Sequence, residues 1–135
     1  MRAFIIQAEN RAGALADLAE AIGQRGINIT GVAGSTWDSA GAIALITNDD
    51  SGTRSILDER GADYRETELV AAGMEDRPGT LAAAARRLAD RGVNIEAIMP
   101  TGMQGTRVTV AFAVEDVNAA REALGDMALT GTASI

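Results

Sequence analysis

Two short segments of this chain repeat each other: NRAGAL at residues 10–15 and DRPGTL at residues 76–81. Each is followed at the same distance by a second shared segment, RGINI at 25–29 and RGVNI at 91–95. Both pairs are 66 residues apart, and nine of the twenty aligned positions are identical, at Arg11, Gly13, Leu15, Ala16, Ala19, Arg25, Gly26, Asn28 and Ile29 and their partners. Matching glycine, asparagine and arginine positions in one register indicate an internal duplication.

Each half also has the same order of predicted elements. Short apolar runs predict strands, and apolar residues at helical spacing follow each polar turn. Glycine at 26 and 92 is expected to end these helices in the left-handed conformation. The predicted strands are 2–8, 27–35, 42–47 and 62–67 in the first half, and 68–74, 93–101, 107–114 and 127–134 in the second. Shorter helices are predicted at about 53–60 and 117–124.

This order is βαββαβ, twice, which is typical of the ferredoxin-like fold. The predicted class is therefore α+β, with antiparallel sheets and the helices of each repeat on one face. Residues 1–67 and 68–135 are the expected domains. No long linker separates them, so we expect the two repeats to pack side by side.

Composition limits the function. Aromatic residues make up 3% of the chain, so the core must consist mainly of Ala, Val, Ile and Leu. The formal net charge of −7 disfavours nucleic acid and anionic membrane surfaces, which attract basic proteins. No apolar run is long enough to span a bilayer and no signal peptide is recognisable, so a cytoplasmic location is the default expectation.

The side chains that usually carry catalysis are scarce. The sequence contains no His, Cys or Lys, and all its basic side chains are Arg. The commonest general base, thiol nucleophile and transition-metal ligands are therefore missing. We expect no catalytic residues, no metal and no cofactor, and we expect the protein not to be an enzyme. Acidic residues such as Asp49 and Asp116 are explained by helix capping.

The repeated segments resemble the ACT domain, a regulatory module of amino-acid metabolism, and the resemblance covers the chain as two tandem copies. It implies a protein that binds a small amino acid at an interface between ACT modules. The first copy has Ala12 where the second has Pro78, so the first turn is expected to be more mobile.

The chemistry of the turn fits such a ligand. The first N–H groups of a helix have no partner inside it and attract a carboxylate. Glycine allows close approach to the backbone, and arginine adds charge-assisted hydrogen bonds. The candidate ligand-binding residues are Asn10, Arg11, Ala12, Gly13, Ala14, Asn28 and Ile29 in the first half, and Asp76, Arg77, Pro78, Gly79, Thr80, Asn94 and Ile95 in the second.

Structural roles compete with these assignments. Asn10 and Asp76 are also typical helix N-caps, the arginines are also typical surface charges, and the asparagines at the strand entries also stabilise turns. Leu15 and Leu81 are expected in the core. Trp37 is expected in a hairpin turn, partly packed on the sheet. Because Asp76 repels a carboxylate and Asn10 does not, the two turns are expected to differ in affinity or to hold opposite ends of the ligand.

The expected function is allosteric regulation by amino-acid binding without catalysis. The alternative is a regulatory subunit that binds and controls a separate amino-acid biosynthetic enzyme. A homodimer is expected in both cases, because edge strands need covering and twofold dimers are the commonest closed assembly.

Overall fold

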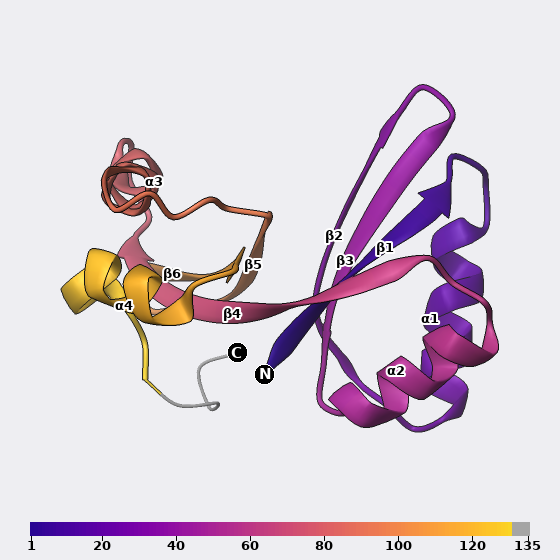
Figure 1. Ribbon diagram of the computed structural model, residues 1–135. Coiled ribbons are helices and arrows are strands. Elements are labelled where there is room, and N and C mark those ends of the chain that lie inside the picture. Colours follow the sequence, from indigo (N-terminus) through magenta and orange to yellow (C-terminus); the bar gives the residue numbers. More distant parts are fainter. Residues whose placement is uncertain (131–135) are drawn as a thin grey trace. The chain divides into compact units, whose positions relative to one another are not determined.

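The computed structural model describes residues 1–130 (Figure 1). The chain forms two compact units, Met1–Glu66 and Thr67–Ile135, which we call the first half and the second half. Each half has the ferredoxin-like order of elements predicted from the sequence. The halves are described separately below.

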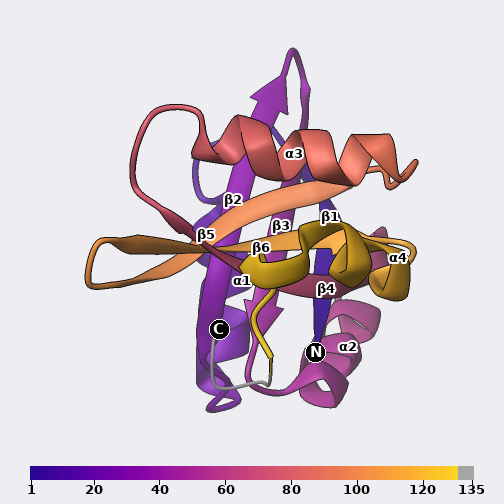
Figure 2. The ribbon, with the colours of Figure 1, turned by 90° about the vertical axis from the view of Figure 1, so that its left-hand side faces the viewer.

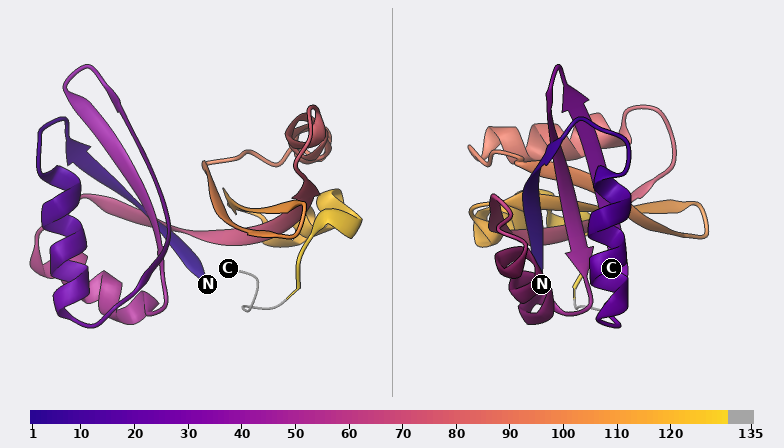
Figure 3. Two further views of the ribbon diagram at one scale, coloured as in Figure 1. Left: turned by 180° about the vertical axis from the view of Figure 1, so that it is seen from behind. Right: turned by 90° about the vertical axis from the view of Figure 1, so that its right-hand side faces the viewer.

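The first half contains three complete strands and two helices. Its elements are β1 (Arg2–Glu9), α1 (Ala14–Gln24), β2 (Ile29–Trp37), β3 (Ala40–Thr47) and α2 (Asp50–Glu59), followed by the start of β4 (Tyr64–Glu75). β3 pairs antiparallel with both β1 and β2, so β2 lies at the edge. Just ahead of β4, the chain bonds to β1 through the Gln7 N–H, which donates to Asp63 O at 2.9 Å. Both helices cover one face of these strands (Figure 3).

The second half repeats this pattern. It contains the rest of β4, then α3 (Thr80–Asp90), β5 (Ala97–Gln104), β6 (Arg107–Val114) and α4 (Val117–Leu124), and a 3₁₀ turn at Gly125–Met127. β6 pairs antiparallel with β4 and β5, and β5 lies at the edge. Figure 2 shows α3 and α4 running alongside these strands.

The end of each repeat differs from the prediction. The strands expected at 62–67 and 68–74 form one continuous strand, β4, because residues 64–75 contain no proline and no turn sequence that would end it. The strand expected at 127–134 is reduced among the described residues to a bridge between Ala72 and Ala128, with Leu129 N–H donating to Ala71 O at 2.8 Å. Residues 131–134 of that prediction lie outside the described residues.

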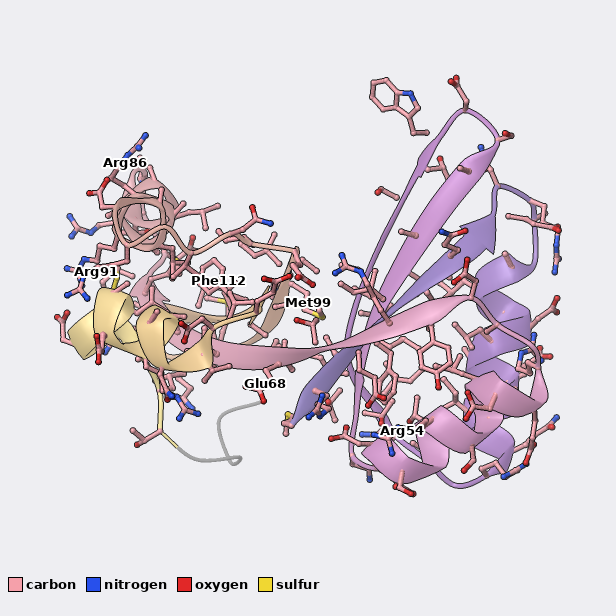
Figure 4. All side chains as sticks on the ribbon, viewed as in Figure 1. Arg54, Glu68, Arg86, Arg91, Met99 and Phe112 are labelled. Carbon is pink, nitrogen blue, oxygen red and sulfur yellow. The ribbon has the colours of Figure 1, made fainter. Side chains whose placement is uncertain are left out.

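Each half has its own aliphatic core between sheet and helices, as the composition predicted. In the first half the core consists of Phe4, Ile6, Leu18, Ile22, Ile27, Ile43, Leu45, Ile56 and Leu57. In the second half it consists of Val70, Ala72, Met74, Ala84, Leu88, Val93, Val110, Phe112, Val114, Ala120 and Leu124. Each core contains a fully buried phenylalanine, Phe4 on β1 and Phe112 on β6. Figure 4 labels Phe112.

The 66-residue step holds only through part of each repeat. Ala8 on β1 pairs with Gly41, and the equivalent Met74 on β4 pairs with Val108, which is 67 residues later than Gly41. The extra residue is accommodated by a register shift between Pro100 and Gly102 on β5. Helix α2 begins after Asp49 and α4 after Asp116, which is again a step of 67.

The predicted helix ends are confirmed. Gly26 and Gly92 follow α1 and α3 with φ of 71° and 69°, as a left-handed helix end requires. The Asp49 carboxylate accepts from Gly52 N–H and the Asp116 carboxylate from Ala119 N–H, each at 2.9 Å. These two acidic residues are N-caps, as predicted.

The prediction for Trp37 is wrong in two respects. Trp37 is the last residue of β2 rather than a turn residue, and its side chain is 84% exposed rather than packed on the sheet. The turn itself consists of Asp38 and Ser39, and Asp38 takes a φ of 53°. Aspartate adopts this left-handed conformation more readily than most residues do.

An ion pair joins α2 to β4 in the first half. Arg54 Nε and Nη2 donate to Glu66 Oε2 and Oε1 at 2.9 and 2.5 Å, which is the bidentate geometry favoured by guanidinium and carboxylate. Figure 4 shows Arg54 beside α2. The hydrogen bonds and charge of Arg54 lower the pKa of Glu66 from its ordinary value.

We predict that this pair stabilises the first half at neutral pH and not in acid. A carboxylate whose pKa is lowered in the folded state contributes stability above its unfolded pKa of about 4.3, and loses it as pH falls through the folded value. Glu66→Gln should therefore melt a few degrees below the unsubstituted protein near neutral pH and at the same temperature below about pH 3. Thermal unfolding followed by circular dichroism measures this difference.

Glu68→Gln is the matched control, because the exposed Glu68, labelled in Figure 4, belongs to the same strand and has no ion pair among residues 1–130. It should change the melting temperature little at any pH. A Glu66→Gln deficit that is the same at neutral and acid pH would contradict the electrostatic explanation.

Candidate functional site

The repeated segments form the same turn twice, between β1 and α1 and between β4 and α3. In each turn the arginine N–H donates to the carbonyl two residues earlier, Arg11 to Glu9 and Arg77 to Glu75, both at 2.9 Å. The residues that precede the helices are Gly13 and Gly79, with φ of 87° and 90°. A side chain is strained at such φ values, which explains why glycine occupies both positions.

These helices begin without a side-chain cap. No side chain accepts a hydrogen bond from the first turn of α1 or α3. The first i→i−4 hydrogen bond of α1 runs from the Asp17 N–H to Gly13 O at 2.9 Å, and that of α3 from the Ala83 N–H to Gly79 O at 3.0 Å. The N–H groups of Leu15 and Ala16, and those of Leu81 and Ala82, have no acceptor within residues 1–130. Two amides at each helix start are thus free to bind a ligand.

Asn10 and Asp76 are not N-caps, so this alternative for them is wrong. They lie three residues ahead of the glycine that occupies the cap position. Asn10 instead joins the turn to the β2–β3 hairpin, where its Nδ2 donates to Asp38 O at 2.7 Å. The Asp76 side chain has no hydrogen-bond partner in the described part of the chain, and its N–H donates to Thr106 O.

A cavity opens beside the uncapped helix start of the first half. Its volume is about 490 Å³, and it lies between the turn, the start of α1 and the β2–β3 hairpin. Three predicted site residues, Asn10, Arg11 and Ala14, line it together with neighbouring residues and the edge strand β2. The lining residues are Ala8, Glu9, Asn10, Arg11, Ala14, Leu15, Val32, Ala33, Gly34, Ser35, Thr36, Gly41, Ala42 and Ile43.

The second half has the equivalent cavity, with a volume of about 380 Å³. It is formed by the turn, the start of α3 and strands β5 and β6. The lining residues are Met74, Glu75, Asp76, Arg77, Gly79, Thr80, Leu81, Ile98, Pro100, Val108 and Val110. Apart from the turn, its walls are apolar side chains.

The leucines of the repeated segments are not core residues, contrary to prediction. Leu15 is 51% and Leu81 50% exposed, and both line the cavities. They lie in the first helical turn, ahead of the buried face formed by Leu18 and Ile22 in α1 and by Ala84 and Leu88 in α3. Helical periodicity does not show where along a helix the sheet stops covering that face.

Some predicted site residues lie away from the cavities. Asn28 immediately precedes β2 and Ile29 is its first residue, while Asn94 and Ile95 lie ahead of β5. They are separated from the turns by a whole helix of 11 residues, a length of about 16 Å at 1.5 Å per residue. The Asn28 N–H donates to Asn48 Oδ1 at 3.0 Å, and Ile29 and Ile95 pack on the cores. Their role in ligand binding stays a prediction.

The rest of the predicted set lies in or beside the turns. Ala12 and Pro78 belong to the turns but line neither cavity, and Gly13 shapes the helix start without lining the first cavity. Ala14 and Thr80 line the cavities. The Thr80 hydroxyl donates to Glu75 O at 2.8 Å or Arg77 O at 3.0 Å, which fixes the turn of the second half.

Sequence reasoning missed the walls contributed by the hairpins. Val32 and Gly34 on β2, and Ile98 and Pro100 on β5, face the cavities from edge strands. Because side chains alternate between the two faces of a strand, the sequence could have shown that Val32 and Gly34 share a face, and that Ile98 and Pro100 do. It could not have shown that this face meets the turn, because that requires the strand order.

The arginines of the two turns differ in their environment. Arg11 Nη2 donates to Asp17 Oδ2 at 3.0 Å and its Nε to Glu9 Oε2 at 3.2 Å. The hydrogen bond and charge of Asp17, and then those of Glu9, raise the pKa of Arg11 above its ordinary value. Arg77 has no ion pair within residues 1–130.

No group of three or more acidic side chains among the described residues is arranged to hold a metal ion. No helix in residues 1–130 is long and apolar enough to cross a membrane.

Comparison with known proteins agrees with this fold. The sequence model of the ACT domain family matches residues 68–126, which lie in the second half. A search of curated protein sequences finds no significant match.

Solved structures with the same fold cover nearly the whole chain. A protein from Bacteroides thetaiotaomicron is 21% identical, with a TM-score of 0.75, over 93% of this chain and 86% of its own. The regulatory subunit of aspartate kinase from Thermus thermophilus, in its ligand-free form, is 18% identical, with a TM-score of 0.69, over 93% of this chain and 90% of its own. A putative regulatory domain of aspartate kinase from Porphyromonas gingivalis is 16% identical, with a TM-score of 0.59, over 96% and 93%. At these identities the likeness shows the fold.

The left-handed glycine ahead of α3 gives a direct stability prediction. Gly79→Ala should destabilise the second half by about 1–2 kcal/mol, because alanine is strained at positive φ. A methyl group at Gly79 would meet no atom within 4 Å, so backbone strain is the whole effect. Urea unfolding measures the change.

Gly23→Ala is the matched control, since a methyl group there also meets no atom within 4 Å and Gly23 lies in helical backbone within α1. It should stabilise the first half by about 0.5–1 kcal/mol. Equal effects of the two substitutions would be inconsistent with strain at Gly79.

Proposed function

We propose that this protein is a non-catalytic regulatory protein that binds a free amino acid at the start of an ACT-domain helix. The observation that carries the proposal is the pairing of unbonded amides with a cavity. In the second half the free N–H groups of Leu81 and Ala82 lie at the start of α3, beside a cavity of about 380 Å³ that Leu81 itself lines. The positive end of the helix attracts a carboxylate to this point.

We further propose that residues 1–67 form a second ACT domain. The first half has the same turn, the same left-handed glycine and an equivalent cavity. It also has two unbonded amides, those of Leu15 and Ala16, at the start of α1. The domains are then 1–67 and 68–135, and the duplication of the sequence reflects a tandem pair.

The proposal is tested by ligand-dependent stabilisation. Each of the twenty common amino acids is added at millimolar concentration and the melting temperature is recorded. At least one should raise it, because a ligand at a hundredfold excess over its dissociation constant stabilises the folded state by about 2.7 kcal/mol. Calorimetry on the amino acids that do so then gives the stoichiometry.

A flat response to all twenty amino acids, combined with no heat of binding, would reject the proposal. The same response to an amino acid and to its amide, which lacks the carboxylate, would reject the assignment of the carboxylate to the helix start.

We also propose that two copies of the chain form a homodimer through an edge strand. β2 and β5 lie at the ends of the strand order. Each carries an exposed branched side chain, Val32 at 45% and Ile98 at 39% exposure, next to an exposed leucine of the helix start. Edge strands with apolar surface favour pairing with another edge. Such pairing would close the cavities and place the amino acid between modules.

Sedimentation velocity of charged variants tests the dimer. The unsubstituted protein should sediment as a dimer, and either Val32→Lys or Ile98→Lys should produce monomers, because an unpaired charge would be buried at the interface. Ser55→Lys, on the exposed surface of α2, should leave the dimer intact. A monomeric unsubstituted protein, or dimers in both edge variants, would contradict this proposal.

The alternative function is a regulatory subunit of a separate metabolic enzyme. It is favoured by the fold shared with a protein described as the regulatory subunit of aspartate kinase. Tagged protein recovered from its native lysate should then carry one enzyme in stoichiometric amount, with a yield that changes when the bound amino acid is added. Recovery of the protein alone favours the independent sensor.

A further inference from the structure

Trp37 is the most exposed large apolar side chain in residues 1–130, at 84%. The three other aromatic side chains of the protein are buried or partly buried. The backbone beside Trp37 is held in place, because Asn10 Nδ2 donates to the carbonyl of the next residue, Asp38. Tryptophan is among the residues that most often anchor contacts between proteins. Its exposure on a fixed hairpin therefore marks a surface for a partner.

Trp37 belongs to a row of three residues that crosses the first half on the sheet face opposite the helices. It pairs with Ala40 on β3, and Ala40 pairs with Glu9 on β1. Paired residues of adjacent strands share a face, and the core residue Ile43 of β3 lies on the other one. Neighbouring strands lie about 4.8 Å apart, so Trp37 and Glu9 are about 10 Å apart in the sheet. We call Trp37, Ala40 and Glu9 the tryptophan row, and only a methyl group stands at its centre.

The second half has a guanidinium at the centre of the equivalent row. The residues there are Gln104, Arg107 and Glu75, since Arg107 pairs with both of the others. Arg107 Nη2 donates to Gly73 O at 3.0 Å, and Arg107 Nε lies 3.9 Å from Glu75 Oε1. The duplication thus shows how an arginine side chain lies on this face, beside the glutamate that ends the row.

The two glutamates differ in how far they are covered. Glu75 accepts from Thr106 Oγ1 at 3.0 Å through Oε2 and faces Arg107 through Oε1, and its side chain is 49% exposed. The side chain of Glu9 is 81% exposed. Its Oε2 accepts from Arg11 Nε at 3.2 Å, and its Oε1 has no partner within residues 1–130. The tryptophan row therefore has an exposed indole at one end, an available carboxylate oxygen at the other, and no guanidinium between them.

This face of the first half carries only negative charge. No arginine occurs at the alternate positions of β1, β2 and β3 that share the face, and the protein contains no lysine. Asp38, which follows Trp37, is exposed, and its side chain has no partner in the described part of the chain. The net charge of the whole protein is −7. Such a surface attracts a basic partner and repels a second copy of the same chain.

A difference between the halves places the incoming group near Trp37. A side chain at Gly73 would begin 3.6 Å from Arg107 Nη2, so glycine makes room for the guanidinium in the second half. The equivalent residue of the first half is Gln7, which is exposed. A guanidinium bound to the first half is therefore displaced from β1 toward β2, where Trp37 lies.

We propose that the tryptophan row is a docking site for an arginine side chain in a basic segment of a separate protein. The guanidinium stacks on the Trp37 indole, lies over Ala40 and donates to Glu9 Oε1. Arginine fits this row because its planar guanidinium both stacks on aromatic rings and hydrogen-bonds a carboxylate. The inference goes beyond the proposed function and does not depend on amino-acid binding.

Tryptophan fluorescence observes this docking directly. Trp37 is the only tryptophan of the chain, so the intrinsic emission reports on this row alone. The probe is the peptide acetyl-Arg-Ala-Arg-Ala-Arg-amide, whose ends are capped so that it does not resemble a free amino acid. It should change the emission saturably, whereas the same peptide with citrulline, which has the shape of arginine without its charge, should not. The lysine peptide should bind at least about threefold more weakly, because an ammonium group does not stack as a plane.

Variants are compared by the fluorescence anisotropy of a fluorescein-labelled arginine peptide, which does not require the tryptophan. Trp37→Leu should weaken binding by about threefold to fivefold through loss of the cation–π contact. Glu9→Gln should weaken it by about twofold to fivefold. Glu20→Gln is the matched control, because it removes the same charge from an exposed residue of α1 that has no ion pair within residues 1–130. It should change the affinity by less than about 1.5-fold.

Ala40→Arg provides the converse test. It gives the first half the residue that the second half has at this position, so the guanidinium of the chain itself should fill the row. Peptide binding should become at least about tenfold weaker. Ala40→Ser, which adds no charge and little bulk, should retain the affinity within about twofold. Circular dichroism verifies that both variants are folded.

Two results would overturn the inference. Equal binding of the arginine and lysine peptides, unchanged by Trp37→Leu and Ala40→Arg, would show general attraction to an acidic protein. Loss of a dimer in sedimentation velocity on Trp37→Leu would show that a second copy covers the row. Neither result bears on amino-acid binding, and a flat response to the twenty amino acids would reject the proposed function while leaving this docking site in place.

Discussion

The candidate sites depend on one backbone constraint, which is the left-handed glycine immediately ahead of α1 and α3. With φ near 90°, Gly13 and Gly79 end the turn and occupy the cap position of the helix, where they have no side chain that could cap the first amides. α2 and α4 show the opposite solution, with an aspartate that accepts from the helix start. α1 and α3 have no such side-chain cap, and these are the helices beside the two cavities.

The duplication preserved this backbone and changed the side chains around it. Both halves retain the glycine, the following leucine and the turn hydrogen bonds, so the geometry of the helix start is the same. Charge and size differ: Asp17 is replaced by Ala83, and Gly41 by Val108. The two halves therefore share a scaffold and differ in the residues that line their cavities.

Much of the fold could be predicted from the sequence, because its determinants are local. Periodicity gave the strands and helices, glycines gave the ends of α1 and α3, and Asp49 and Asp116 gave the starts of α2 and α4. What could not be predicted depends on pairing between distant segments. Leu15 and Leu81 have helical spacing but lie beyond the part of the helix that the sheet covers. The two strands predicted at 62–67 and 68–74 form one strand, β4, because no residue between them ends the strand. The cavity walls on β2 and β5, and the partners that occupy Arg11 and Glu75, required the strand order and the side-chain contacts.

The central claim is that free amides at the start of a helix bind the carboxylate of an amino acid. The most direct measurement is a titration with the amino acid that most raises the melting temperature, in which the backbone amide resonances of the whole chain are followed by NMR. The account predicts that the N–H protons of Leu81 and Ala82 move downfield as they gain an acceptor, with saturation at the calorimetric affinity. Saturable binding that leaves these two resonances unchanged while others move would contradict it.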